Sequence, residues 1–335
     1  MKRILFILLV FLPSLAFPQP AKEKGLNSIN KQKAKAYIEF LASDVLEGRE
    51  AGKLGGRIAG EYIISVLREI GIVPFDDDNN GCTQPFTAYA KERQTKSRYS
   101  IDPAIITEYK KDKAHRKLDL RNILGYIEGK NRNEIVIIGA HYDHLGVDES
   151  LADDKIYNGA DDNASGVSAV LQIAKAFVES GQQPERTVIF AFWDGEELGC
   201  LGSEYFTSNF PDLQMVKGYL NFDMIGRNND ESKPEQVVYF YAKEKPVFKE
   251  WLTKDIRSYG LKLKPDYKTL DKSTGGSDNI SFTRKGIPVI WYHTDGHPDY
   301  HQPSDHADEI NWDKLVDITK AAYLNFWNMA NLPNY

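Results

Sequence analysis

Short apolar runs and amphipathic stretches alternate along most of the chain. The apolar runs predict strands, which we place at 122–129, 134–140, 187–193, 217–223, 236–242 and 288–292. Apolar residues that recur every three or four positions predict helices at 165–180, 246–259 and 312–331. Strands that alternate with helices predict an α/β fold. We expect a three-layer sandwich, with a mostly parallel mixed central sheet and helices on both faces.

The chain before residue 122 has a less regular pattern. Ser28 is expected to cap a first helix that runs to Leu41, and a second helix is expected to end at about Ile70. Residues 85–118 predict an irregular or edge-strand segment that is too short to be a separate domain. We therefore expect a single domain over residues 20–335.

The first 19 residues have the layout of an export signal. Lys2 and Arg3 precede the apolar run 4–12, and small residues follow it. The run is too short to span a membrane. Residues 1–19 therefore predict a signal peptide and a periplasmic or extracellular protein with no stable membrane insertion.

Charge and cysteine content narrow the partners. The 335 residues include 42 Lys and Arg against 48 Asp and Glu, a net charge of −6 that argues against a nucleic-acid partner. The one basic cluster, 110–117, is expected to be a solvated loop face. Cys82 and Cys200 fit one disulfide or two separate buried thiols equally well. No feature of the sequence indicates an oligomeric state.

Acidic and histidine side chains gather where the predicted strands end. His141 and Asp143 follow the first of these strands, Asp162 opens the helix after it, and the others follow later strands: Glu196, Glu197, Asp223 and His301. Ligands of an open α/β sheet bind at the carboxyl ends of its strands. Histidine mixed with carboxylates, without cysteine, is the ligand set of a non-structural zinc site.

Two zinc ions per chain are the cofactors that this set predicts. Two ions held about 3.5–4 Å apart share a bridging carboxylate, and Asp162, at a glycine-led turn, is the natural bridge. His141 and Asp223 would complete the ligand set of one ion, and Glu197 and His301 would complete that of the other. Glu196 is then left as the catalytic base.

Other polar residues in these segments are expected to support the site rather than form it. His144 and His297 are predicted to order loops or orient ligands, and Asp161, Asp194 and Asp305 to cap elements or lie in solvent. The sequence contains neither a Gly-x-Ser-x-Gly nor a His-Glu-x-x-His motif, which removes the main support for a serine hydrolase or a thermolysin-like enzyme.

Five motifs together resemble the co-catalytic di-zinc aminopeptidases of the bacterial leucyl aminopeptidase type, a family that includes glutamate carboxypeptidase relatives. They occur in the family's order: AHYDHLG (140–146), NGADDNASGV (158–167), DGEELGCLGSEYF (194–206), NFDMIGR (221–227) and DYHQPSD (299–305). LASDVLEGREAG (41–52) also resembles the N-terminal segment of secreted members. The resemblance implies the zinc-peptidase fold and the ligand assignments given above. It also implies that Asp143 orients His141. Some members of the family carry a protease-associated insert, and residues 85–118 are too few to form it.

The activity that this resemblance implies is hydrolysis of an N-terminal peptide bond. Its substrate would be a peptide or small amino-acid derivative with a free N-terminus. The metals would hold the attacking water, Glu196 would move its proton, and Tyr300 would donate a hydrogen bond to the oxyanion. Aminopeptidase, dipeptidyl-peptidase and carboxypeptidase variants all remain open, as does the preferred N-terminal residue.

Two alternatives share the expected fold. Glutaminyl-cyclase-like acyltransferases use one zinc and have a different helix-opening loop. Non-catalytic binding ectodomains on this fold lose metal ligands. All five predicted ligands are present in this chain, which favours the peptidase.

Overall fold

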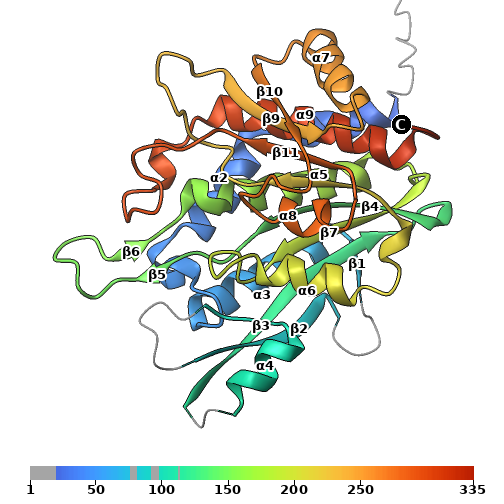
Figure 1. Ribbon diagram of the computed structural model, residues 1–335. Helices are drawn as coiled ribbons and strands as arrows, with labels where there is room; N and C mark the ends of the chain where they lie inside the picture. Colours follow the sequence, from blue (N-terminus) through green and yellow to red (C-terminus); the bar gives the residue numbers. More distant parts are fainter. Residues whose placement is uncertain (1–19, 76–80, 92–97, 112–113) are drawn as a thin grey trace, which may run out of the picture.

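The computed structural model describes residues 20–75, 81–91, 98–111 and 114–335, and these residues form a sheet flanked by helices (Figure 1). The predicted signal peptide at 1–19 lies outside the described residues. No helix in the described part of the chain is both long and apolar enough to cross a membrane.

The strands carry these bounds: β1 Val73–Pro74, β2 Thr83–Lys91, β3 His115–Ile127, β4 Asn131–His141, β5 Gly146–Val147, β6 Ile156–Tyr157, β7 Arg186–Trp193, β8 Val216–Phe222, β9 Gln236–Ala242, β10 Lys264–Leu270 and β11 Val289–His293. The α-helices are α1 Ala21–Ser28, α2 Lys31–Leu41, α3 Leu54–Glu69, α4 Pro103–Tyr109, α5 Gly166–Ser180, α6 Leu201–Asn209, α7 Val247–Tyr259, α8 Asn279–Thr283 and α9 Trp312–Asn331. Short helical turns are η1 Asp44–Arg49, η2 Ala160–Ser165, η3 Leu213–Met215 and η4 Ala307–Glu309.

The central sheet is mixed, with its parallel strands in the middle. Its order is β1-β3-β7-β4-β8-β11-β9-β10, and β2 pairs with β3. Strands β7, β4, β8 and β11 are parallel neighbours, whereas antiparallel pairing begins at β3 on one side and at β9 on the other. The predicted α/β sandwich is confirmed. Its four central strands all end at one edge of the sheet.

Alternate residues of β4 face opposite sides of the sheet, as the pleat of a strand requires. Val136 and Ile138 belong to one apolar cluster, and Ile135 and Ile137 belong to another. Both faces are therefore buried, which explains why this strand reads as a continuous apolar run.

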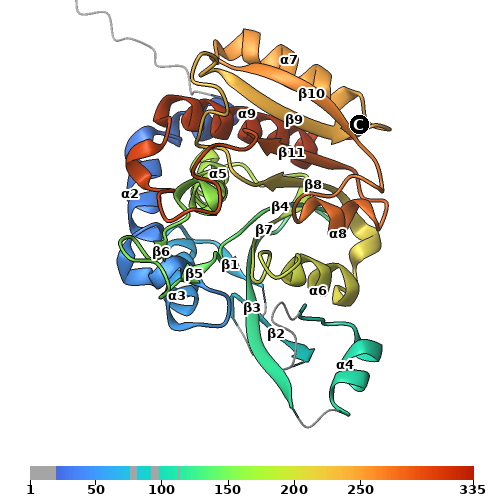
Figure 2. The same ribbon diagram turned by 60° about the vertical axis from the view of Figure 1, so that its left-hand side comes forward.

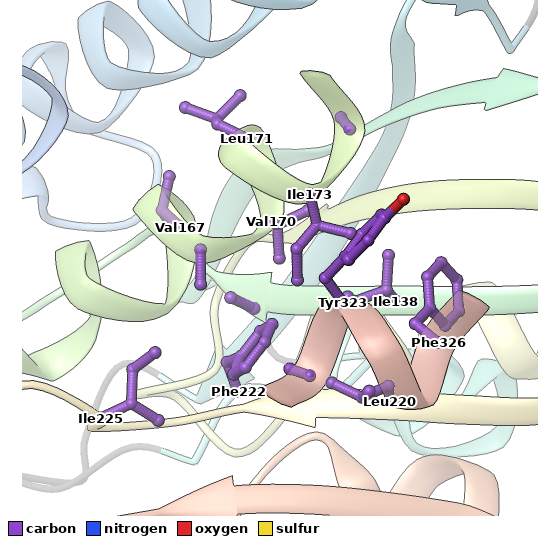
Figure 3. Packing of buried hydrophobic residues seen from close by; sticks show 14 of the residues in the cluster. Ile138, Val167, Val170, Leu171, Ile173, Leu220, Phe222, Ile225, Tyr323 and Phe326 are labelled. Atoms are coloured by element: carbon purple, nitrogen blue, oxygen red, sulfur yellow. The ribbon is translucent and has the colours of Figure 1, made fainter. Parts of the chain in front are cut away.

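Helices α5 and α9 cover one face, and α6 and α8 cover the other (Figure 2). The predicted apolar face of α5 is buried, with Val167, Val170 and Ile173 at most 1% exposed. These side chains pack with Ile138 of the sheet and Tyr323 of α9 (Figure 3). Burial of this kind stabilises a fold by about 25 cal/mol per Å² of apolar surface.

The first third of the chain differs from the expectation. Asn30, not Ser28, caps the helix at Lys31–Leu41, because its side chain accepts a hydrogen bond from the Lys33 N–H at 3.0 Å. Ser28 instead ends α1, in a segment that lacks a strong apolar period.

The segment 85–118, expected to be irregular or an edge strand, contains the edge strand β2, which pairs only with β3 in the described part of the chain. Strand β2 and the first half of β3 form an antiparallel arm that extends from the sheet, with α4 beside it (Figure 2). The predicted strands 122–129 and 134–140 are not neighbours, since β7 lies between β3 and β4.

The two cysteines do not pair with each other. Cys82 is buried just before β2, whereas Cys200 begins α6 and its thiol donates to Glu196 Oε1 at 3.3 Å. No disulfide is therefore formed between them.

Candidate metal centre

The carboxyl ends of β4, β7 and β8 bring their polar residues to one place because the three strands are adjacent and parallel. His141 is the last residue of β4, Asp223 follows β8, and Glu196 and Glu197 follow β7 in a short turn. Asp162 comes from η2, between β6 and α5.

The first group of donor atoms surrounds the buried imidazole of His141. Its Nε2 lies 3.4 Å from Asp162 Oδ1, 3.7 Å from Asp223 Oδ1 and 4.0 Å from Glu196 Oε2. This nitrogen is buried and has no hydrogen-bond partner in the described part of the chain. A buried polar atom without a partner is costly unless it binds something else.

The second group surrounds the other oxygen of Asp162. His301, in the loop after β11, places Nε2 3.2 Å from Asp162 Oδ2 and 3.2 Å from Glu197 Oε2. The two oxygens of Asp162 thus face different histidines. A carboxylate that bridges two metal ions has this arrangement.

Zinc fits both groups. Ligand atoms held about 2.0–2.1 Å from a tetrahedral ion lie about 3.3 Å from one another, close to the observed separations of 3.2–3.7 Å. Four carboxylates also converge here, none more than 15% exposed at the side chain: Asp162, Glu196, Glu197 and Asp223. Buried negative charge of this density requires cations.

The pKa shifts follow from the same crowding. Burial alone would raise the pKa of Asp162, but His144, His141 and His301 hold it well below its usual range. The pKa of Glu196 is raised, because burial and the nearby Asp223 carboxylate outweigh the attraction of His141. In the metal-free site the crowding therefore shifts the pKa values of the two acids in opposite directions.

Asp143 supports the site differently from the expectation. Its carboxylate lies 3.8 Å from His141 Nδ1, too far for a hydrogen bond, and the contact at 3.2 Å comes from its main-chain oxygen. The carboxylate instead accepts hydrogen bonds from the N–H groups of Glu196, at 3.0 Å, and Glu197, at 3.3 Å. Asp143 thus orients the turn that carries both glutamates.

His144 lies closer to the donor atoms than a loop-ordering role requires. Its Nδ1 is 2.8 Å from Glu197 Oε1 and 3.8 Å from Asp162 Oδ2. Among the described residues, two sets of three side chains have ligand atoms close enough to hold an ion, and His144, Asp162 and Glu197 are one of these sets. The other group is His141, Asp162 and Asp223. Both His144 and His301 thus reach Glu197, one on each of its oxygens.

Arg49 is a site residue that the sequence reasoning missed. Its buried guanidinium donates to five main-chain oxygens, those of Leu41, Tyr142, Asn158, Gly159 and Asp162. Burial lowers its pKa to about 10, although Asp162 and Asp305 oppose the shift. Arg49 therefore ties the N-terminal segment to the loops of two predicted ligands. The only signal in the sequence was the motif LEGREAG.

Asp305 was expected either to cap an element or to lie in solvent; it is fully buried and its carboxylate caps the start of η2. Its carboxylate accepts hydrogen bonds from the N–H groups of Asp161 and Asp162 at 3.0–3.1 Å. Gly159 permits the same turn at φ +58°, where a Cβ would lie 2.1 Å from the Asp162 oxygen and 2.5 Å from the His144 ring. The hydrogen bonds to Asp305 and the backbone conformation of Gly159 together position Asp162. Asp161 and Asp194 are buried as well.

A cavity of about 260 Å³ opens beside the donor atoms. Met224 and Trp291 give it apolar walls, and Tyr300 lies at its edge, 45% exposed and stacked on the His301 ring at 3.9 Å between centroids. Burial and Asp162 raise the pKa of Tyr300, so its hydroxyl stays protonated and able to donate.

Comparisons with known proteins show similarity in both sequence and fold. The chain is 31% identical over 226 residues to "Probable lipoprotein aminopeptidase LpqL" of Mycobacterium tuberculosis, a match that covers 57% of this chain and 42% of that protein. The match to each of the first curated relatives spans less than half of that relative's length.

Solved structures of two activities share the fold. A zinc aminopeptidase of Bacillus subtilis superposes with a TM-score of 0.67 at 16% identity, over 92% of this chain and 97% of that one. A glutaminyl cyclase of Bacteroides thetaiotaomicron superposes with a TM-score of 0.61 at 21% identity, over 90% and 98%. These likenesses show the fold. The family profile matches residues 122–325, more than half of the sequence, and the chain belongs to peptidase family M28.

Proposed function

We propose that this chain is a zinc-dependent aminopeptidase that hydrolyses the N-terminal bond of peptides. One observation carries the proposal: the two oxygens of Asp162 face two histidines, His141 and His301, and each histidine has a further carboxylate within 4 Å. This is the donor set of two zinc ions that share a bridge.

In this proposal His141, Asp162 and Asp223 would hold one zinc ion, and Asp162, Glu197 and His301 would hold the other. Bound zinc lowers the pKa of water and polarises a carbonyl group. The Glu196 carboxylate accepts the proton of the attacking water and later donates it to the leaving amine.

The remaining cavity residues bind and orient the substrate. The cationic α-amine lies against the acidic cluster, and the first side chain lies between Met224 and Trp291. The Tyr300 hydroxyl donates a hydrogen bond to the oxygen of the scissile carbonyl. Names of relatives support the activity, since a curated relative and a structural neighbour are both described as aminopeptidases.

We also propose that residues 1–19 direct export and that residues 20–335 form one domain without an inserted domain. The relative described as a lipoprotein is compatible with export. Mass spectrometry of the exported chain should show an N-terminus near residue 20. A cytoplasmic chain that retains Met1 would contradict the proposal.

Substrate assays separate the aminopeptidase from a glutaminyl cyclase and from a binding protein. The purified chain should release free N-terminal amino acids from a panel of aminoacyl anilides and tripeptides. Formation of pyroglutamate from an N-terminal glutamine peptide, without amino-acid release, would favour the cyclase. Turnover of neither substrate in the presence of zinc would favour a binding protein.

A further inference from the structure

A second cavity lies on the far side of Glu197 from the cavity beside His141 and His301. We call it the arm cavity; it has a volume of about 570 Å³ and is lined by the segment after η1, the start of β3 and the turn after β7. Glu197 lines both cavities. Its Oε2 faces His301, and its Oε1 contacts His144, which lines the arm cavity. The two cavities therefore adjoin at the Glu197 side chain.

The wall of the arm cavity changes in charge from inside to outside. Its inner part holds the buried carboxylates of Asp143 and Glu197. Its outer part holds three exposed cations, Lys53, Arg116 and Lys117. The exposed carboxylate of Glu50 is the one opposing charge among the outer lining residues. The mouth is therefore positive, whereas the metal centre is negative.

Two of these cations are available to a ligand. Lys117 is paired with Asp119 at 2.9 Å. Lys53 and Arg116 have no carboxylate within 4.0 Å among the residues that the structure describes. The Arg116 guanidinium lies over the Tyr99 ring, 5.5 Å from its centroid, and Tyr99 also lines the cavity. The ring contact holds the guanidinium at the mouth.

We propose that the arm cavity binds the part of the substrate that follows the scissile bond, and that Arg116 and Lys53 pair with its C-terminal carboxylate. The proposal rests on the proposed aminopeptidase function. A peptide has a cationic N-terminus and an anionic C-terminus, which match the acidic metal centre and the basic mouth. Small-ligand pockets have volumes of roughly 300–1,000 Å³. The preferred substrates are therefore short peptides with a free C-terminal carboxylate.

The basic cluster 110–117 was expected to be a solvated loop face. Lys110 and Lys111 are exposed in the turn after α4, as expected, whereas the exposed residues Arg116 and Lys117 are in a strand. Arg116 and Lys117 belong to β3, within the arm, while residues 112–113 lie outside the described residues. Because β3 continues into the central sheet, the arm fixes these cations relative to the metal centre.

Paired substrates test the subsite. The kcat/KM for Leu-Gly-Gly should exceed that for its C-terminal amide by about fivefold, because a partly exposed ion pair strengthens binding by about that factor. Arg116→Gln should reduce this preference to about twofold or less, Arg116→Lys should retain most of it, and Arg116→Glu should reverse it. The ratio is independent of the fraction of folded enzyme, so partial unfolding of a variant does not affect it.

Arg132→Gln is the matched control, because Arg132 is exposed at the opposite end of β4. It should keep the wild-type ratio. Equal kcat/KM for acid and amide, or an unchanged ratio in Arg116→Gln, would overturn the subsite. Hydrolysis of leucyl anilide by the wild-type chain, which involves no carboxylate, tests the proposed function separately. Failure to cleave the anilide and both peptides would overturn both proposals.

Discussion

Glu196 is the acidic residue to which we assign proton transfer rather than metal binding. Its Oε2 lies 4.0 Å from His141 Nε2, farther than either Asp162 or Asp223, and its Oε1 accepts a hydrogen bond from the Cys200 thiol. Its main-chain N–H is held by the Asp143 carboxylate at 3.0 Å. The residue is thus fixed in place with one oxygen directed at the metal centre.

Glu196→Gln should lower kcat by about 10²–10⁴-fold, because the amide cannot accept the proton of the attacking water. Zinc content should stay at the wild-type value, since the variant keeps every proposed ligand. Glu204→Gln, an exposed change in α6, is the matched control. Steady-state kinetics with metal analysis would measure both properties. A wild-type kcat in Glu196→Gln would exclude it as the base.

Arg49→Lys should weaken zinc binding about 10–100-fold, because the loss of a side chain that orients metal ligands lowers metal affinity by about this factor. A lysine has three donors on one nitrogen and cannot reach the five oxygens that the guanidinium contacts. Competition with a chelator of known affinity would measure zinc binding, and urea unfolding of the zinc-free chain would measure the structural loss separately.

Arg57→Lys, an exposed change in α3, should leave both values at wild type. If Arg49→Lys lowered only the free energy of unfolding, with zinc affinity unchanged, Arg49 would stabilise the fold without positioning ligands.

Sequence patterns predicted the buried strands and helices of the core and missed an exposed strand at the edge of the sheet. Strands β4 and β7 and helix α5 were anticipated, because their apolar runs reflect burial on both sides. Strand β10 was not, because KPDYKTL is largely exposed at the sheet edge. Arg49 could not be assigned a role either, because four of its five partners lie more than 90 positions away in the sequence. No local pattern indicates these contacts.

Lys314, in the first turn of α9, should make stability depend on pH. Burial lowers its pKa from 10.5 to about 8, although Asp161 opposes the shift. Between pH 8 and pH 10.5, Lys314 holds its proton more often in the unfolded chain than in the folded chain. Its contribution to the free energy of unfolding therefore rises as the pH increases over this range. The penalty for burying the charged form is fully present below pH 8.

Lys314→Met should therefore reduce the rise in stability over this pH window, by up to about 3 kcal/mol. Urea unfolding at several pH values between 7 and 10.5 would measure it, with Lys320→Met on the same helix as the control. Parallel pH dependence in wild type and Lys314→Met would show that Lys314 is charged in the folded chain throughout.

At the scale of the molecule, the described residues form a core of parallel strands and an antiparallel arm. The core places five predicted ligands from distant parts of the sequence at one edge of the sheet. This convergence was predictable, because parallel strands end at the same edge. The arm cavity was not, since it depends on how β2 and β3 pair and where the arm points. The alternation of Phe86, Ala88 and Ala90 indicates a strand but not its partner or its direction.

Zinc titration of the metal-free chain is the most direct test of the central claim. Release of the N-terminal amino acid from a tripeptide should be absent in chelator and should rise with added zinc to a plateau at two ions per chain. Two ions are expected because Asp162 presents one oxygen to each histidine group. Full activity in chelator would contradict the account, and so would a plateau at one ion per chain.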